Sequence, residues 1–122
     1  MIFFVGDKPS DKNLNPDVAF VGTKSYKRLL EWMYHLDADV TDTVLCNKHQ
    51  INDRLEVITA HLHTSIEPGD KVVALGKNAA KRLSELKIEH FEMPHPSGAN
   101  RKLNDKKYVR DVLRRCKIYL DL

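Results

Sequence analysis

A short polar loop, Gly6-Asp7-Lys8-Pro9-Ser10, directly follows the apolar residues 2–5. Glycine at this point lets the chain turn sharply and lets a ligand approach the backbone closely, and the proline stiffens the turn. Asp7 can act as an acid, a base or a hydrogen-bond acceptor, and Lys8 as a cation or a nucleophile. The alternative interpretation is a surface turn built from common turn residues.

A second polar loop, His95-Pro96-Ser97-Gly98, follows the strand-like residues 88–93. Pro94 and Pro96 flank the histidine, so they restrict its backbone and fix its direction. Ser97 and the amide of Gly98 are small donors suited to phosphate or carbonyl oxygens. The alternative is a histidine that is structural or merely exposed.

Two further residues could contact a flat ligand. Phe20 stands in a polar loop without strand or helix periodicity, so its ring could stack on a base or anchor the loop to the core. Asn47 closes a short strand, where an amide can present a donor and an acceptor to a base edge. Its alternative is a turn-forming asparagine at a strand end.

Alternating strand-like and helix-like segments must position these side chains. The sequence predicts strands at residues 1–5, 43–46, 71–75 and 88–93. Apolar residues recur at helical spacing in four segments: Tyr26, Leu29, Leu30, Met33 and Leu36; Ile51, Leu55, Ile58 and Leu62; Ala79, Ala80, Leu83 and Leu86; Tyr108, Val109, Val112, Leu113, Cys116 and Leu120. Asn52 or Asp53 would begin the second helix, and Asn104 would cap the last.

This alternation predicts an α/β fold, a three-layer α/β/α sandwich with a central parallel sheet of about four strands. A chain of 122 residues that is 42% hydrophobic fits one domain, residues 1–122. Loops at the carboxyl ends of parallel strands face one shared crevice. Two polar loops nearly a chain length apart would therefore meet over one pocket, which favours an enzyme.

Composition narrows the function classes. The chain has no apolar stretch near the roughly 20 residues of a membrane helix and no signal-peptide pattern, so we expect a soluble, cytoplasmic protein. Cys46 and Cys116 are expected to be buried free thiols, and two cysteines cannot supply a four-cysteine iron–sulfur site. His61 and His63 would point to different helix faces, so no metal and no cofactor are expected.

The net charge of +3 is small, but its distribution is uneven. Between residues 101 and 117, Asp105 and Asp111 face eight basic residues: Arg101, Lys102, Lys106, Lys107, Arg110, Arg114, Arg115 and Lys117. Such a run is either a solvated helix face or a footprint for a phosphate backbone.

In this order, the loop after the first strand, the phenylalanine, the strand-end asparagine and the His-Pro-Ser loop resemble the uracil-DNA glycosylase superfamily. The pattern is most similar to the branch with a G-E-A-P-G loop, a P-F-V-G segment and an A-L-G-x-x-A-A turn. Here these are residues 6–10, Ala19-Phe20-Val21-Gly22 and residues 74–80. The likeness spans nearly the whole chain. The chain is shorter than typical members and lacks the cysteine cluster of that branch, and a chain so compact would suit a phage-encoded member.

The resemblance implies roles for individual residues. Phe20 would stack on a flipped-out pyrimidine, Asn47 would read its Watson–Crick edge, and His95 would stabilise negative charge on the leaving base. Asp7 would orient or deprotonate water, or stabilise the cationic sugar. The remaining implied contacts are with the substrate for Gly6, Pro9 and Ser10, and with DNA for Ser97, Gly98, Asn100, Arg101 and Lys102.

We therefore expect a metal-free DNA glycosylase acting on uracil or a 5-substituted uracil in DNA, for repair or modification. It would be a monomer in a bacterial or phage-infected host cytoplasm. Lys8 stands where many members hold a catalytic Asp or Asn, so a second hypothesis makes it the nucleophile of a lyase or base-modifying enzyme. A third hypothesis is a catalytically silent nucleic-acid-binding protein on the same fold.

Overall fold

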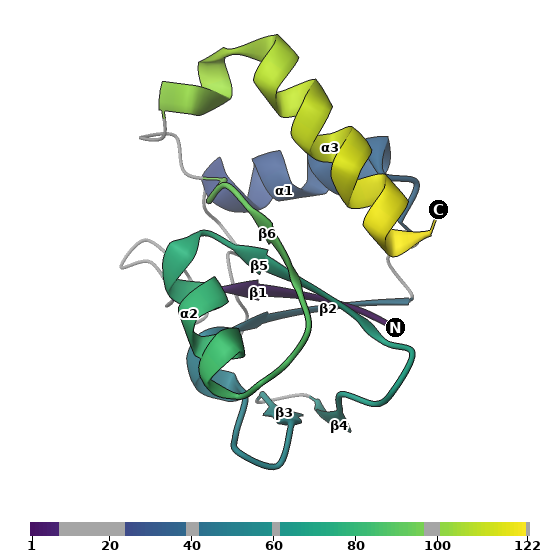
Figure 1. Ribbon diagram of the computed structural model, residues 1–122, viewed down its shortest axis with the longest axis vertical. Coiled ribbons are helices and arrows are strands. Elements are labelled where there is room, and N and C mark those ends of the chain that lie inside the picture. Colours follow the sequence, from purple (N-terminus) through teal and green to yellow (C-terminus); the bar gives the residue numbers. More distant parts are fainter. Residues whose placement is uncertain (8–23, 39–41, 60–61, 97–100, 122) are drawn as a thin grey trace.

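The computed structural model describes residues 1–7, 24–38, 42–59, 62–96 and 101–121, and its centre is a four-stranded parallel sheet (Figure 1). The strand order is β2-β1-β5-β6, and each neighbouring pair is parallel. The bounds are Ile2–Gly6 for β1, Thr43–Asn47 for β2, Lys71–Leu75 for β5 and Phe91–Met93 for β6. Strands β1 and β5 are nearly continuous apolar runs, as expected of parallel strands that are covered on both faces.

Two helices cover one face of this sheet. Helix α1 (Lys24–His35) and helix α3 (Lys106–Leu120) lie together above the strands (Figure 1). Their buried side chains form one cluster with those of the sheet: Phe4, Leu29, Trp32, Met33, Leu36, Val73, Leu75, Met93, Val112, Cys116 and Leu120. Leu30, expected to face inward, is 38% exposed, and Trp32 is buried in its stead.

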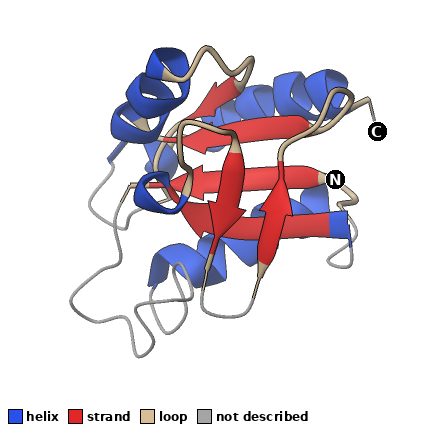
Figure 2. Cartoon of the chain, turned by 90° about the horizontal axis from the view of Figure 1, so that it is seen from below, coloured by secondary structure: helices blue, strands red, loops and turns tan. Residues whose placement is uncertain are grey.

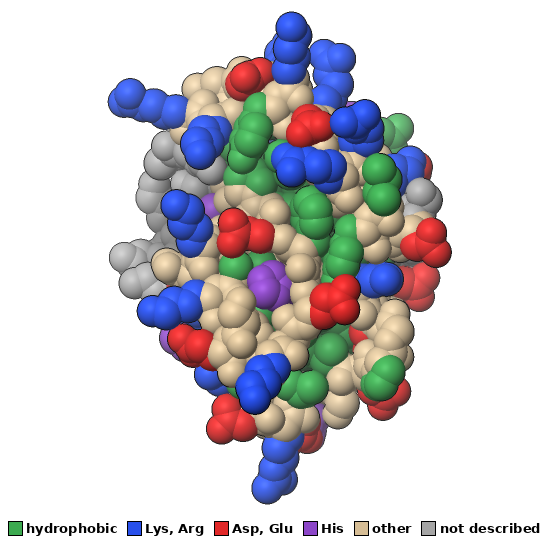
Figure 3. Space-filling model, viewed as in Figure 1, with side chains coloured by type: hydrophobic (Ala, Val, Ile, Leu, Met, Phe, Trp, Pro, Cys, Tyr) green, Lys and Arg blue, Asp and Glu red, His purple; other side chains and the backbone are tan. Residues whose placement is uncertain are grey.

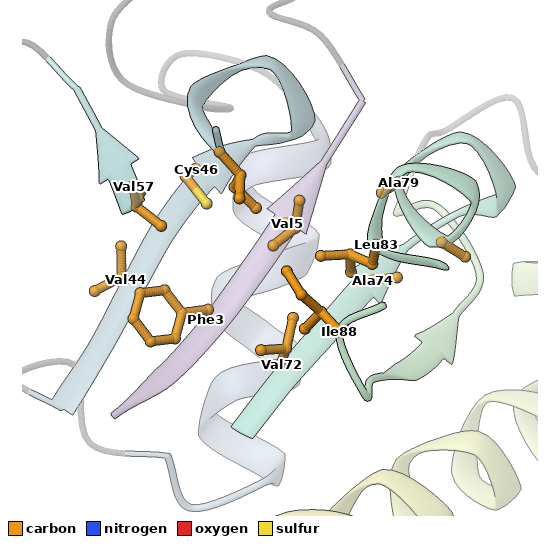
Figure 4. Packing of buried hydrophobic residues seen from close by; sticks show 12 residues of the cluster. Phe3, Val5, Val44, Cys46, Val57, Val72, Ala74, Ala79, Leu83 and Ile88 are labelled. Carbon is orange, nitrogen blue, oxygen red and sulfur yellow. The ribbon is translucent and has the colours of Figure 1, made fainter. Parts of the chain in front are cut away.

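Helix α2 (Lys77–Glu85) covers the opposite face, which gives the predicted α/β/α layers. Figure 4 shows how Ala79 and Leu83 of this helix approach Val5 and Ala74 of the sheet. The small alanines allow the helix to pack closely. The three-layer fold predicted from the sequence is therefore confirmed.

The predicted second helix, over residues 51–62, is wrong. A single 3₁₀ turn, η2 (Lys48–Gln50), leads into an antiparallel pair, β3 (Glu56–Ile58) and β4 (His63–Ser65), which crosses the same face as α2 (Figure 2). The Asn52 side chain forms a turn, because its Oδ1 accepts hydrogen bonds from the backbone N–H groups of Arg54 and Glu56 at 2.9 and 3.1 Å. Leu55 then has a φ of 60°, which no helix continues.

The helical spacing of that segment is coincidental, since only part of it faces the core. Val57 is fully buried and contacts the sheet beside Cys46 and Val44 (Figure 4), whereas Ile58 is 47% exposed. His63, expected on a helix, lies in β4, and its Nε2 is 2.8 Å from Oε2 of Glu56 across the pair.

The start of α3 differs from expectation by one residue. Asn104 ends a short 3₁₀ helix, η3 (Arg101–Asn104), and Asp105 is the N-cap of α3. Its Oδ1 accepts from the backbone N–H groups of Lys107 and Tyr108 at 3.0 and 3.3 Å.

Both cysteines are free and buried, as expected. Burial raises the pKa of the Cys46 and Cys116 thiols to about 12 in each case, so both stay protonated and unreactive at neutral pH. Across the described helices, none combines the length and apolarity needed to cross a membrane.

Candidate active site

The carboxyl ends of the strands bring distant parts of the chain together. Gly6, the last residue of β1, pairs in register with Asn47, the last residue of β2. On the other side, Leu75 of β5 pairs with Met93 of β6, so the segments leading to Gly76 and His95 leave the same edge. This edge is the crevice in which parallel α/β sheets bind ligands.

Asp7 is held at this edge by two partners. Its Oδ1 lies 2.9 Å from the Lys48 ammonium, and its Oδ2 accepts a hydrogen bond from the Asn78 amide at 2.9 Å. The backbone adds a third link, because the N–H of Lys48 donates to the Asp7 carbonyl at 3.3 Å. With its side chain 26% exposed, the carboxylate is oriented yet open to solvent. We call Lys48 and Asn78 the Asp7 clamp.

Asn47 is the only buried polar residue among those described, at 4% exposure. Its Oδ1 accepts the N–H of His49 at 2.9 Å, and its own N–H donates to Oε1 of Gln50 at 3.0 Å. These bonds cap η2, so the turn-forming interpretation of Asn47 holds. With Oδ1 engaged by the backbone, the Nδ2 amide is the group left to contact a ligand.

His95 stands half-buried between two prolines at the end of β6. Burial lowers the pKa of its imidazole, and the negative charge of Asp7 opposes this with a smaller effect. The ring is therefore neutral at neutral pH, and one of its nitrogens carries a proton that it can donate in a hydrogen bond.

Gly76 makes room for this histidine. Its φ is 99° and its N–H donates to the Met93 carbonyl at 2.8 Å, which ties the end of β5 to the end of β6. A Cβ placed on Gly76 would lie 3.1 Å from the Cβ of His95. The glycine therefore allows both a left-handed backbone and the close approach of the His95 side chain.

The structure thus brings Asp7, Asn47 and His95 to one edge of the sheet, and Gly6 with them. Arg101 and Lys102 are exposed in η3, after the loop that contains His95. The other predicted site residues lie outside the described residues: Lys8, Pro9, Ser10, Phe20, Ser97, Gly98 and Asn100.

Sequence reasoning missed the Asp7 clamp. Lys48 directly follows the strand-end asparagine, and Asn78 lies in the first turn of α2 within the segment Ala74–Ala80. Both residues follow the carboxyl end of a strand, and this place in the sequence could have indicated that they lie near Asp7. The clamp also borders a hollow of about 350 Å³, which Lys48 and Asn78 line together with His49, Lys81, Arg82 and Glu85. Its charged side chains are Lys48, Lys81 and Arg82 against Glu85, and Lys48 is paired with Asp7.

No three His, Cys, Asp or Glu side chains gather as metal ligands within the part of the chain that the structure describes.

Comparison with known proteins adds a family-level finding. Residues 1–117 match the family described as the Uracil DNA glycosylase superfamily, which is nearly the full length of the chain. No curated protein matches the chain.

Proposed function

This chain belongs to the uracil DNA glycosylase superfamily, and from that premise we propose that it hydrolyses the N-glycosidic bond of uracil or a 5-substituted uracil in DNA. The observation that carries the proposal is the gathering of Asp7, Asn47 and His95 at one edge of the sheet. These residues are far apart in sequence, and together they offer an anion, an amide donor and a neutral imidazole. A base must leave the stack to reach such a site, so the substrate is a flipped-out nucleotide.

Asp7 would act on the sugar side of the bond. As the glycosidic C–N bond breaks, its electron pair leaves with the base, and positive charge develops on the sugar. A carboxylate fixed at both oxygens by Lys48 and Asn78 is preorganised to stabilise that charge and to orient the attacking water. The water oxygen bonds to the sugar carbon, and its proton passes to solvent or to the departing base.

His95 would act on the base side. The leaving base carries the electron pair as an anion, and a neutral imidazole can donate its N–H to the base oxygen where this charge gathers. The lowered pKa of His95 supports this role, because it keeps the ring neutral, and a neutral imidazole retains one N–H that it can donate.

Asn47 would select the base with its Nδ2 amide, which donates to a carbonyl oxygen and is mismatched to an amino group. Stacking by Phe20, contacts from Gly6, Pro9 and Ser10, and a phosphate grip by Ser97, Gly98 and Asn100 complete the proposed site. Arg101 and Lys102 would follow the strand beyond it.

The test uses labelled oligonucleotides that carry uracil or 5-hydroxymethyluracil, single- and double-stranded, followed by alkali. We expect strand breaks at the modified position with wild type, and loss of these breaks with Asp7→Asn. Asp53→Asn is the matched control, because it makes the same change at a side chain that is 93% exposed. No breaks with either base or with deaminated purines would overturn the proposal and leave binding without turnover.

Lys8 is tested separately with borohydride. An adduct with DNA that disappears in Lys8→Ala would make this lysine the nucleophile of a lyase. Activity without any adduct supports hydrolysis by water.

A further inference from the structure

A groove between α1 and α3, away from the Asp7 clamp, encloses about 630 Å³. Its apolar lining is formed by Trp32, Leu103, Val109 and Leu113. Trp32 is 4% exposed and the three aliphatic side chains are half-buried, so they form the floor. Exposed and half-buried basic residues of both helices stand around this floor.

The rim of the groove carries a strong excess of positive charge. Glu31 is the one acid in the lining, against Arg28 of α1 and Lys106, Arg110, Arg114 and Lys117 of α3. Figure 3 shows Lys and Arg side chains gathered around hydrophobic surface at the end of the molecule that α3 covers. Arg114 pairs with Asp111 and Lys117 with Asp37, but such exposed pairs are weak and exchange readily for a phosphate.

One end of the groove is lined by Leu103 of η3 and Lys106 at the start of α3. Helix α3 follows β6 and η3 in the chain, and it starts on the side of the molecule where the strands of the sheet end (Figure 1). From Lys106 to Lys117 the basic residues recur along the helix over roughly 16 Å, at a rise of about 1.5 Å per residue. In the sequence, Arg101 and Lys102 of η3 come between His95 and this row.

We propose that this groove binds a single-stranded segment of the DNA whose damaged nucleotide occupies the candidate active site. A ligand for it must offer both anionic groups for the rim and flat apolar groups for the floor. Single-stranded DNA presents phosphates and unpaired bases together, whereas a duplex hides its bases. The DNA substrate of the proposed function favours DNA over an acidic peptide, and in this choice the inference rests on that function.

The experiment measures binding of a labelled fifteen-residue oligo(dT), which contains no uracil, by fluorescence anisotropy over a range of salt. The groove variant is Lys106→Ala with Arg110→Ala. The matched control is Lys107→Ala with Arg115→Ala, which removes the same charges from α3 at exposed residues that do not line the groove. Circular dichroism confirms that both variants stay folded.

We expect the groove variant to bind about tenfold more weakly at low salt, with the control near wild type. The slope of log affinity against log salt should fall by about 1.4, because each lost phosphate contact on a single strand removes about 0.7. An abasic strand of equal charge should bind wild type several-fold more weakly than oligo(dT), and this difference should shrink in the groove variant.

Equal losses of oligo(dT) affinity in the groove variant and the control would overturn the inference. Equal affinities of wild type for oligo(dT) and for the abasic strand would overturn it too. Tighter binding of an acidic amphipathic peptide than of oligo(dT), lost in the groove variant, would assign the groove to a protein partner.

Failure of the proposed function looks different. A chain without glycosylase activity could still lose oligo(dT) binding in the groove variant, and the groove would stand. If the chain is active, KM for a uracil-containing strand of 25 nucleotides should be higher in the groove variant than in wild type. KM for a strand of five nucleotides should be the same in both.

Discussion

The edge of the sheet and the groove between α1 and α3 use charge in opposite ways. At the edge, the Asp7 carboxylate meets the Lys48 ammonium and the Asn78 amide, so its charge is matched and its direction is fixed. In the groove, positive side chains outnumber the single acid and surround an apolar floor. A carboxylate held by fixed partners positions a reacting group, whereas a net excess of positive charge attracts a long anion. Substitutions at the edge should therefore reduce turnover, and substitutions in the groove should reduce the affinity for DNA.

The largest expected effect is at His95. Replacing it with alanine removes the donor to the leaving base, which should raise the barrier by about 2.7–4 kcal/mol, or about 10²–10³ in kcat. DNA affinity should stay near normal. Single-turnover rates and anisotropy measure the two quantities. If turnover and binding fell together, His95 would belong to the binding surface and the contrast between edge and groove would fail.

Gly76→Ala should destabilise the edge. An alanine there has an unfavourable φ near 99° and meets the His95 Cβ at 3.1 Å. We expect a loss of about 1–3 kcal/mol in the free energy of unfolding, together with lower turnover. Gly69→Ala is a matched control, since Gly69 has a φ of 95° with nothing within 4 Å of the added Cβ. Turnover equal to wild type in Gly76→Ala would show that the histidine contact does not matter.

The Asp7 clamp should give a smaller change. Lys48→Met or Asn78→Ala each remove one partner of the Asp7 carboxylate, and we expect kcat to fall about tenfold, which corresponds to about 1.4 kcal/mol of barrier. KM should hardly change, and Lys48→Arg should restore part of the rate. Lys81→Met, in the same hollow, is the control. A clamp variant that raised KM alone would place these residues in the binding function.

The smallest effect concerns pH and stability. Folding lowers the pKa of His95. Above the ordinary pKa of 6.5, the imidazole is neutral in both the folded and the unfolded chain, so the free energy of unfolding does not depend on its titration there. Below that pH the unfolded chain takes up a proton that the folded chain resists, and the free energy of unfolding declines until the folded pKa is passed. Urea unfolding between about pH 7.5 and pH 5 should show this decline in wild type and less of it in His95→Gln.

That window isolates the histidine from the carboxylates whose pKa is shifted. Hydrogen bonds and charges from Lys117 and His63 lower the pKa of Asp37 and Glu56, so any stability they add is lost only below about pH 4.5. Identical slopes for wild type and His95→Gln would show that the imidazole is as hydrated as in the unfolded chain.

The sheet and its helices were predictable because their signals are local. Residues 72–75 are a continuous apolar run, which is typical of a strand covered on both faces. Ala79, Ala80 and Leu83 recur on one helix face. The segment after Ile51 misled because its apolar residues also fit a helix. There the bonds from Asn52 and the left-handed backbone of Leu55 decide the structure, and the antiparallel pair β3–β4 stabilises it.

The location of the site was predictable in outline, because the carboxyl ends of parallel strands must share one edge. The bonds within it were not. The contact between Asp7 and Asn78 joins residues 71 apart, so no local spacing could indicate it. The sequence allows two interpretations of Asn47, and in the structure its Oδ1 caps η2.

The place of β1 in the middle of the sheet has a consequence for synthesis. A ribosome releases residues 2–6 before either partner exists, since β2 begins at Thr43 and β5 at Lys71. Strand β1 cannot pair until β2 and β5 have been synthesised, and its parallel contacts are non-local and therefore slow to form. Asp7, next to this strand, meets Asn78 only after 71 further residues have been made, so the carboxylate gains this partner long after its own synthesis.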